Sequence, residues 1–446
     1  MGESLVLNVD HRRWRTPIAG LAVAALAVLT TSCSDEPDGS GPAAAGGDGG
    51  ASAPATPAAP VIKISPAEGS ATVRPDKKVV VTAAGGALEQ VTVESGGEQV
   101  EGEFDADRTK WVSKAPLKPA SDYTVSARAA GGTTASSSFT TLKPETELAV
   151  ADVTPSVKGE KVGVGAPIIV TFNRPIPSTA GKANVERALE VTAEKPAAGA
   201  WRWIDDKTVI YRTAKFWKAH QKVTFTAHLE GVQGGRGMYG VKDFTKTIRI
   251  GAAQISTVDT RKHKMIVKRD GKVVQTMLIS AGMATTRAYT TTSGVHLAMG
   301  KSNPERMISP GFEKGHPEYY DVMINHAVRF SNSGEYVHAK NNVWAQGRRN
   351  VSHGCINARP DQAKWFYDQV QRGDVIVIKG TDREVEWNNG WSYWQLSFKE
   401  WKKGSALTGE RATGGSDAGD GTAGDADAGG DGADTGDTTG AGATAG

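Results

Sequence analysis

The most informative stretch of this chain is Tyr336-Val337-His338, followed after thirteen residues by Ser-His-Gly-Cys-Ile-Asn at 352–357. Cys355 is one of only two cysteines, and histidines lie beside it and shortly before it. A thiol becomes a strong nucleophile as its thiolate, which a nearby imidazole promotes. One cysteine flanked by two histidines is therefore typical of a cysteine acyltransferase with Cys355 as the nucleophile.

The residues around Cys355 favour the same interpretation. Ser352 can hydrogen-bond within its own loop, and Gly354 lets the backbone approach a substrate closely. Backbone amides at 353–355 can point at the oxygen of a tetrahedral intermediate. The alternative is a buried structural cysteine near two surface histidines, which the complete string disfavours.

The string resembles the catalytic signature of the YkuD-type L,D-transpeptidases, which reads His, a gap, then Ser/Thr-His-Gly-Cys-hydrophobic-Asn. The gap of thirteen residues is at or slightly below the family's usual minimum, and we expect the difference in the loop 341–350. The resemblance implies that Cys355 is the nucleophile and His338 the general base, with its second ring nitrogen held by the Ala339 carbonyl. His353 is expected to orient the loop or to help the oxyanion site. An exchange of roles between the two histidines stays open.

The resemblance also implies a substrate site around the nucleophile. A serine that lines the family's site matches Ser333, and Asn357 is expected to fix the loop through a hydrogen bond. A lid is expected at 301–320, because family lids enclose the substrate peptide with a methionine and tyrosines. The expected counterparts are Met307, Tyr319 and Tyr320, with Phe312 at a position that usually holds tyrosine.

The N-terminus predicts export. Positive charge at 11–15 precedes an apolar stretch at 18–29, which is too short to span a bilayer as a helix. The stretch ends in Leu-Thr-Thr-Ser-Cys, which is similar to a bacterial lipobox, so Cys33 is expected to carry lipid. We predict a lipoprotein signal peptide at 1–32 and an enzyme anchored to the outer face of the cell membrane. The alternative is an ordinary secretory signal cut nearby.

Composition narrows the class of partner. With Cys33 lipidated, Cys355 would be a free thiol in an oxidising compartment, which favours a catalytic role. The net charge of +3 is small, and no basic block indicates nucleic acid. A zinc site on Cys355 and its two histidines would lack a fourth ligand. We expect no metal or organic cofactor, no nucleic-acid partner and a monomer. The remaining histidines of this region are expected to be structural or surface groups: His296, His316 and His326.

The first half of the chain predicts two similar domains. The 446 residues are too many for one compact core, and 33–59 is a flexible tether rich in Gly, Ala, Ser and Pro. Beyond it, short β-branched runs alternate with turn residues, which predicts strands. Ile-Ser-Pro at 64–66 matches Val-Thr-Pro at 153–155, and a second pair of runs repeats at the same offset. We predict tandem immunoglobulin-like β-sandwiches at 60–145 and 146–251, acting as a spacer. The layout is similar to that of actinobacterial L,D-transpeptidases.

Residues 252–380 are predicted to form the catalytic domain. The segment 265–274 predicts a hairpin with an Asp-Gly turn, 361–372 predicts the one main helix, and 375–378 predicts a buried strand. This matches the mostly β YkuD fold. The segment 291–294 reads Thr-Thr-Ser-Gly where the family usually has Thr-Pro before the glycine, so the local turn is expected to differ. The whole chain is therefore predicted to be mostly β.

The C-terminal region divides into two segments. The segment 381–407 is rich in tryptophan and is expected to form a small subdomain that packs back onto a domain, with a glycan-stacking patch as the alternative. The segment 408–446 is acidic and rich in Gly and Ala, which predicts a disordered tail. The tryptophans of the first segment are Trp387, Trp391, Trp394 and Trp401.

The resemblance implies a peptidoglycan L,D-transpeptidase with stem peptides as donor and acceptor. Cys355 would attack the carbonyl of a diaminopimelate at the third stem position, and the amine of another stem would resolve the thioester into a 3→3 cross-link. Transfer to water would instead make the enzyme an L,D-carboxypeptidase. A sortase-like transpeptidase needs an arginine shortly after its cysteine, and neither Arg359 nor Arg372 suits that role. A wall-binding lipoprotein with a decayed catalytic domain is disfavoured by the intact string.

Overall fold

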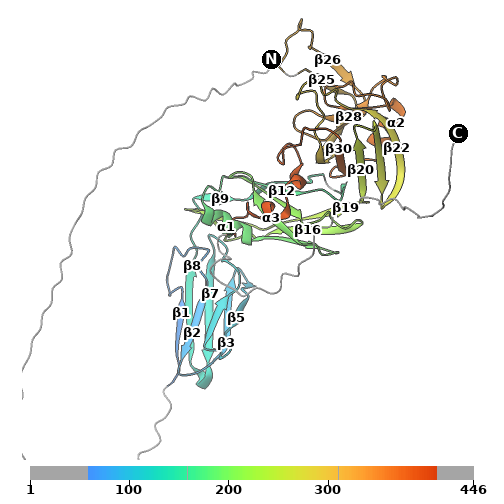
Figure 1. Ribbon diagram of the computed structural model, residues 1–446. Helices are drawn as coiled ribbons and strands as arrows, with labels where there is room; N and C mark the ends of the chain where they lie inside the picture. Colours follow the sequence, from blue (N-terminus) through green and yellow to red (C-terminus); the bar gives the residue numbers. More distant parts are fainter. Residues whose placement is uncertain (1–58, 158, 310, 409–446) are drawn as a thin grey trace, which may run out of the picture. The chain divides into compact units, whose positions relative to one another are not determined.

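The computed structural model describes residues 59–157, 159–309 and 311–408 (Figure 1). The predicted signal peptide, Cys33, the tether up to residue 58 and the acidic tail from residue 409 lie outside the described residues. The described part is mostly β, as predicted. Within these ranges, no helix is both long and apolar enough to cross a membrane.

Two four-stranded sheets form the first β-sandwich. In β7, buried and exposed residues alternate strictly, as expected for a strand with one face on a core. Tyr123 of β7 stacks on Phe139 of β8 inside that core, with ring centroids 5.1 Å apart. The first sheet has the order β1 (Val61–Ser65), β2 (Val80–Ala84), β6 (Lys110–Ser113), β5 (Gly102–Phe104). The second has the order β4 (Glu98–Gln99), β3 (Leu88–Ser95), β7 (Asp122–Ala129), β8 (Thr134–Thr140), and a short 3-10 turn, η1 (Ala130–Gly132), joins β7 to β8.

The second sandwich also has two four-stranded sheets, with a small third sheet and a helix beside them. One sheet is β10 (Val150–Thr154), β12 (Ile168–Phe172), β15 (Thr208–Thr213), β14 (Gly199–Trp203). The other is β11 (Lys161–Val162), β19 (Phe244–Ile250), β16 (Gln221–Ala227), β13 (Leu189–Ala193). The small sheet is β17 (Gln233–Gly235), β18 (Met238–Gly240), β9 (Thr146–Leu148). Helix α1 (Thr179–Arg187) was not predicted; it starts after Ser178, whose hydroxyl accepts from the Gly181 amide at 3.1 Å.

The internal repeat reappears in the strand register. Strand β1 pairs with β2 so that Ile64 faces Val81, and β10 pairs with β12 so that Val153 faces Val170. The offset in sequence from Ile64 to Val153 equals the offset from Val81 to Val170, so the two strand pairs are equivalent. The arrangement agrees with two tandem immunoglobulin-like domains, while the domain boundaries stay predictions.

A nine-stranded sheet forms the framework of the third part of the chain. Its order is β23 (Gly294–Leu297), β30 (Val375–Lys379), β20 (Gln254–Asp259), β21 (Lys264–Arg269), β22 (Lys272–Ser280), β29 (Ile356–Ala358), β28 (Tyr336–Ala339), β27 (Ala327–Arg329), β24 (Gly300–Ser302). A separate hairpin consists of β25 (Glu305–Ile308) and β26 (Asp321–Ile324). The predicted Asp-Gly turn joins β21 to β22, with positive φ at both Asp270 (48°) and Gly271 (81°), as a type I′ turn requires.

Helix α2 (Pro360–Gln369) is the predicted main helix, with proline in its first turn. It buries Ala363 and Phe366 against the sheet. The helix ends at residue 369 and not at 372, because Val370 is extended and the Gln371 amide donates to the Asp374 carboxylate at 2.8 Å. That side-chain bond replaces the next helical bond and turns the chain into β30.

The tryptophan-rich segment packs back onto a domain, as predicted, and that domain is the second sandwich. Trp401 of α3 (Phe398–Lys402) is fully buried and donates to the Ala200 carbonyl at 2.9 Å. Trp394 of η2 (Tyr393–Gln395) donates to the Gly165 carbonyl at 3.0 Å. Because these rings belong to a core, the alternative of a glycan-stacking patch is disfavoured.

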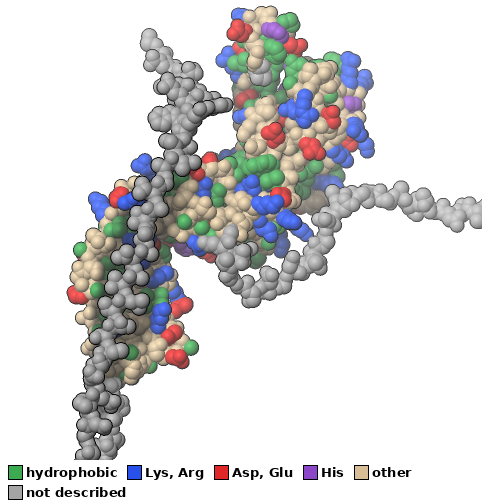
Figure 2. All heavy atoms as spheres, turned by 60° about the vertical axis from the view of Figure 1, so that its left-hand side comes forward, with side chains coloured by type: hydrophobic (Ala, Val, Ile, Leu, Met, Phe, Trp, Pro, Cys, Tyr) green, Lys and Arg blue, Asp and Glu red, His purple; other side chains and the backbone are tan. Residues whose placement is uncertain are grey.

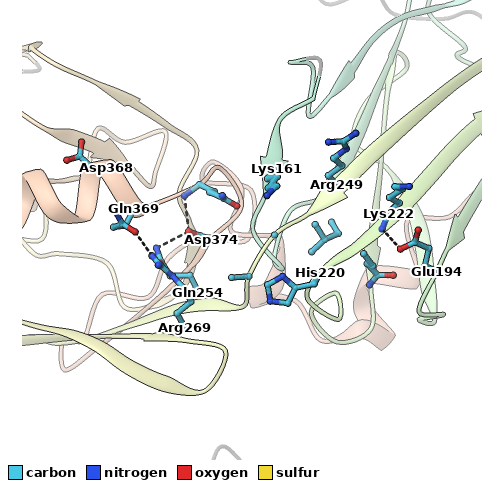
Figure 3. A pocket seen from close by; sticks show the side chains of 15 residues that line it. Lys161, Glu194, His220, Lys222, Arg249, Gln254, Arg269, Asp368, Gln369 and Asp374 are labelled. Atoms are coloured by element: carbon cyan, nitrogen blue, oxygen red, sulfur yellow. Dashed lines mark hydrogen bonds between the residues drawn. The ribbon is translucent and has the colours of Figure 1, made fainter.

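A polar cavity of about 730 Å³ lies where the second sandwich meets the catalytic domain (Figure 3). Lys161, His220 and Arg249 approach it from the sandwich, and Arg269 and Asp374 from the catalytic domain. Nearby, a bidentate ion pair with distances of 2.7 and 2.6 Å joins Arg372 to Glu160. Over the described surface, acidic and basic side chains are interspersed on the face that Figure 2 shows, in keeping with the small net charge.

Candidate active site

Strand pairing brings the two halves of the sequence motif together. Strands β28 and β29 are parallel neighbours, and His338 faces Asn357 in their register. Side chains alternate along a strand, so Cys355, two residues before Asn357, points to the same face as His338. The thirteen residues between the motif halves therefore form a loop that leaves the sheet and returns beside its starting strand.

His338 is held in one tautomer inside the protein. It is 5% exposed, and its Nδ1 donates to the Ala339 carbonyl at 2.9 Å, the contact that the family resemblance implied. The proton on Nδ1 leaves Nε2 as an acceptor. Burial lowers the pKa of His338 to about 4, although the bond to Ala339 opposes this shift. At neutral pH the ring is uncharged and can take a proton.

Cys355 is a thiol in the resting protein. Burial raises its pKa to about 12, the Tyr336 amide lowers it by hydrogen bonding to sulfur, and the charge of Glu335 raises it further. The Sγ atom contacts the Gly334 carbonyl at 3.7 Å. His338 is neutral as well, so the thiol and the imidazole that share this face of the sheet are both uncharged at neutral pH.

The loop that carries Cys355 is fixed by two hydroxyl groups. Ser352 Oγ donates to the Cys355 carbonyl at 2.5 Å and accepts from the Gly354 amide at 3.2 Å. Thr291 Oγ1 donates to the Gly354 carbonyl at 2.7 Å, and Gly354 has a φ of +122°, which favours glycine. The Gly354 amide donates to Ser352 in this structure, and the expectation that amides at 353–355 form the oxyanion site stays a prediction. Asn357 is buried, and its side chain makes no hydrogen bond within the described residues, so Ser352 has the loop-fixing role expected of Asn357.

His353 packs against the lid. Its ring stacks on Tyr289 at 4.3 Å between centroids and lies 5.6 Å from Tyr320. Its Nε2 is 4.0 Å from Glu318, which accepts a 2.6 Å hydrogen bond from Tyr289. These contacts hold the His353 ring between the lid and Tyr289, and the roles of the two histidines stay predictions.

A cavity of about 810 Å³ opens above the thiol. Met307, Tyr320, Ser333 and His353 line it together with Cys355. Phe312 lines it as well, at the position where a tyrosine was expected. Tyr319 is not among the lining residues of the described chain, although it interacts electrostatically with Arg306, which lines the cavity.

Comparison with known proteins gives the same assignment. The family "L,D-transpeptidase catalytic domain" matches residues 253–378, and "Bacterial Ig domain" matches 70–233. L,D-transpeptidase 2 of Mycobacterium tuberculosis (strain CDC 1551 / Oshkosh) is 32% identical over 355 residues, covering 78% of this chain and 85% of that protein. The chain belongs to the L,D-transpeptidase family.

Two further relatives of this L,D-transpeptidase come from mycobacteria. L,D-transpeptidase 5 of Mycobacterium tuberculosis (strain ATCC 25618 / H37Rv) is 31% identical over 367 residues, covering 79% of this chain and 78% of that protein. The solved structure of an L,D-transpeptidase from Mycobacterium smegmatis is 32% identical, covers 53% of this chain and 100% of that chain, and has a TM-score of 0.43.

Asn389 is a site residue of this L,D-transpeptidase that the sequence did not reveal. Its Oδ1 accepts from the amides of Asn332 (2.9 Å) and Ser333 (3.1 Å), and its Nδ2 donates to Ser333 Oγ at 3.0 Å. The tryptophan-rich segment thus fixes the loop that leads into β28 and His338. No local pattern around Asn389 indicates this contact, which joins residues more than fifty positions apart.

The remaining histidines are structural or surface groups, as predicted. His296 is fully buried against Phe330, and burial lowers its pKa. His316 stacks on Phe312, and His326 packs against Tyr367. Across the described ranges, no group of three or more His, Cys, Asp or Glu residues is placed to hold a metal ion.

Proposed function

We propose that this L,D-transpeptidase forms 3→3 cross-links between peptidoglycan stem peptides through a thioester on Cys355. The observation that carries the proposal is the pairing of β28 with β29, which places Cys355 on the same face as His338, a buried and uncharged histidine. The cavity above the thiol has a volume typical of sites that bind small peptides or drug-sized ligands. Membership of the family supports the same substrate class.

Acylation starts from the uncharged pair. His338 Nε2 takes the thiol proton while sulfur attacks the carbonyl of the third stem residue, a diaminopimelate. The C–S bond forms, the C–N bond to the terminal D-alanine breaks, and the imidazolium returns its proton to the leaving amine. A general base of this kind contributes about 10²–10⁴-fold. The Ala339 carbonyl keeps the other ring nitrogen protonated, so Nε2 always faces the reaction as acceptor.

Transfer to the acceptor uses the same pair in reverse. The side-chain ammonium of a second stem loses one proton to His338, and the amine so formed makes a C–N bond with the thioester carbonyl. The C–S bond breaks, one further proton passes from nitrogen to sulfur, the amide keeps the last N–H, and His338 releases its proton to solvent. None of these steps uses a metal or an organic cofactor. Water in place of the amine would give an L,D-carboxypeptidase.

The sortase-like alternative lacks its arginine. Arg372 forms the ion pair with Glu160 at the junction with the second sandwich, and Arg359 pairs with Asp361 at the start of α2. Both guanidinium groups are therefore engaged in contacts that do not include the thiol.

The proposal includes a lipid anchor on Cys33, supported by the apolar stretch at 18–29 and the lipobox-like sequence that follows it. One acyl chain gives only marginal membrane binding, so stable anchoring needs at least two. Mass spectrometry of the N-terminus of membrane-bound protein tests this. A mature protein found in the medium with an N-terminus other than Cys33 would rule out the anchor.

Mass spectrometry of the protein mixed with a disaccharide tetrapeptide tests the reaction. We expect a thioester adduct and 3→3 dimers with wild type, and neither with Cys355→Ala. His338→Ala should slow acylation more than His353→Ala, because the Ala339 contact leaves His338 Nε2 as an acceptor, whereas the His353 ring packs on Tyr289. Dimers formed by Cys355→Ala would refute the mechanism, a larger loss in His353→Ala would exchange the two roles, and tripeptide without dimer would indicate the carboxypeptidase.

A further inference from the structure

Four charged side chains line the cavity above Cys355, in addition to His353. Two are engaged by neighbouring groups: Arg306 forms a bidentate pair with Asp321, and Glu318 lies between Tyr289 and His353. The other two are Glu335 and Arg383. Within the described residues, neither forms an ion pair with the other or with any third group.

Glu335 presents a buried carboxylate next to the nucleophile. It is 4% exposed, and both of its oxygens accept from Thr292, at distances of 2.8 to 3.0 Å. Ser333 Oγ donates to the same carboxylate at 3.2 Å. Extending the β28–β29 register by two residues places Glu335 opposite Gly354, and a side chain at Gly354 would meet Glu335 Cγ at 3.8 Å. The groups that bind the Glu335 carboxylate are therefore hydrogen-bond donors. The negative charge of Glu335 raises the pKa of the Cys355 thiol.

Arg383 supplies the opposite charge from the tryptophan-rich segment. Its Nη1 donates to the carbonyls of Thr290 and Arg287, each at 3.0 Å, so the guanidinium is fixed by dipoles and not by an acid. Arg383 also lines an adjoining polar cavity of about 490 Å³, which shares Asn332 and Ser333 with the cavity of the thiol.

The segment 290–292 connects the partners of the two charges. Arg383 binds the carbonyl at one end of it and Glu335 binds the amide at the other. Two residues of chain span at most about 7 Å, so these two backbone groups lie within that distance. Both side chains line the cavity of the thiol and form no ion pair with each other in the described residues, so both charges are open to one ligand that carries an amine and a carboxylate on one carbon, with a hydrogen bond of about 2.9 Å at each end.

We propose that Glu335 and Arg383 form the subsite for the amino-acid head group of the acceptor stem, with its ammonium toward Glu335 and its carboxylate toward Arg383. This assignment rests on the proposed cross-linking function. The diaminopimelate side chain ends in a carbon that bears both groups, whereas a lysine side chain ends in an amine alone. The subsite therefore selects diaminopimelate acceptors and brings the attacking nitrogen to the thioester. Once the amine loses its proton to His338, the reaction continues as described above.

The test compares three acceptor tripeptides, which lack the bond that the donor step cleaves. They carry at position three meso-diaminopimelate, its side-chain amide, or lysine, and each is offered to wild type with one tetrapeptide donor. We expect the kcat/KM for cross-linking to fall from the first to the last by about tenfold to a hundredfold, as for the loss of a charge-assisted hydrogen bond. Equal use of all three acceptors by an active enzyme would overturn the subsite, and absence of any cross-link would instead count against the proposed function.

Variants locate the preference in the two side chains. Arg383→Gln should remove the discrimination between diaminopimelate and lysine, Arg383→Lys should keep part of it, and Glu335→Gln should raise the acceptor KM about tenfold for all three amines. Carbapenem acylation, which needs no acceptor, is measured in every variant, and we expect the acceptor reactions to change by a larger factor than acylation does. Uniform loss of acylation and of all three acceptor reactions would mean a structural role only and would overturn the proposal.

Two matched variants serve as controls. Arg287 and Glu384 line the adjoining cavity but not the cavity of the thiol. Arg287→Gln removes a positive charge, as Arg383→Gln does, and Glu384→Gln removes a negative charge, as Glu335→Gln does. We expect wild-type acceptor preference from both controls. If either control lost the preference while Arg383→Gln and Glu335→Gln retained it, the head group would belong in the adjoining cavity and the assignment would fail.

Discussion

At the scale of single residues, the reactivity of this site depends on burial more than on charge. Burial raises the pKa of Cys355 to about 12 and lowers that of His338 to about 4, so both are uncharged across the neutral range. A thiolate–imidazolium pair, the usual activated form of a cysteine nucleophile, would need shifts of the opposite sign. In the proposed reaction, the thiol therefore keeps its proton until a substrate excludes water and His338 accepts that proton.

This resting state predicts two different pH profiles. Alkylation of Cys355 by iodoacetamide needs the thiolate, so its rate should rise about tenfold per pH unit from pH 7 to 10 without a plateau. Carbapenem acylation uses neutral His338 as base, so it should rise through about pH 4 and stay level from pH 6 to 9. Both rates are measured by mass spectrometry with Cys355→Ala as background. An alkylation rate already level below pH 8 would show a thiolate–imidazolium pair instead.

The sequence predicted where Cys355 and His338 lie better than it predicted the contacts that hold them. Cys355, His338 and the Ala339 contact follow from a motif in which every position is constrained. Glu335 is one acid among many in the sequence, and its contact with Thr292 spans more than forty positions. Tyr319 and Tyr320 are adjacent tyrosines, and only the backbone conformation decides which of them faces the cavity. Contacts of this kind depend on strand pairing that a single sequence does not show.

At the scale of elements, the turn from α2 into β30 contains a buried carboxyl group, Asp374, at the junction of the second sandwich and the catalytic domain. Asp374 is 2% exposed; its Oδ2 accepts from Gln254 at 3.0 Å and from the Gln371 amide at 2.8 Å. Its Oδ1 has no hydrogen-bond partner within the described residues. The helical pattern of the sequence continues to residue 372, so the predicted helix is too long at its C-terminal end. The hydrogen bond from the Gln371 amide to Asp374 turns the chain before that point.

Asp374→Asn should therefore change how stability depends on pH. Burial raises the pKa of Asp374 from 3.8 to about 7, so its contribution to stability is complete below about pH 4 and is lost as pH rises through 7. The variant should match wild type near pH 4 and be more stable by about 4 kcal/mol at pH 8. Urea unfolding at both pH values measures the difference. Asp368→Asn is the matched control, because Asp368 lines the same cavity but is paired with Lys364 (Figure 3). An unchanged pH dependence in Asp374→Asn would contradict the assignment.

At the scale of the molecule, the catalytic domain and the second sandwich share one core. Leu297 and Val375 of the nine-stranded sheet belong to the same buried cluster as Trp201 of the sandwich and Trp401 of the tryptophan-rich segment. The first sandwich has a separate core of its own. The sequence predicts a domain boundary at 252, where the internal repeat ends. The buried core continues across that boundary.

The shared core decides which fragment can fold. Arg212 of the second sandwich is 2% exposed, lies 4.8 Å from the Trp394 ring centroid and 5.1 Å from that of Trp401, and donates to the Leu396 carbonyl at 2.7 Å. A fragment cut at 252 loses this partner surface, and each buried aromatic ring that it exposes removes several kcal/mol, at about 25 cal/mol per Å² over roughly 150–250 Å².

We therefore expect residues 146–408 to fold and to cross-link soluble tetrapeptide at a rate within about twofold of the full chain, because the first sandwich is absent from the site and from the shared core. Residues 252–408 should be insoluble, or should unfold at least about 10 °C lower, since one kcal/mol shifts the midpoint of a domain of this size by a few degrees. Thermal unfolding and mass-spectrometric cross-linking rates, compared for the two fragments at equal concentration, measure both effects. A soluble and fully active 252–408 fragment would show that the second sandwich is only a spacer, as the sequence alone suggested.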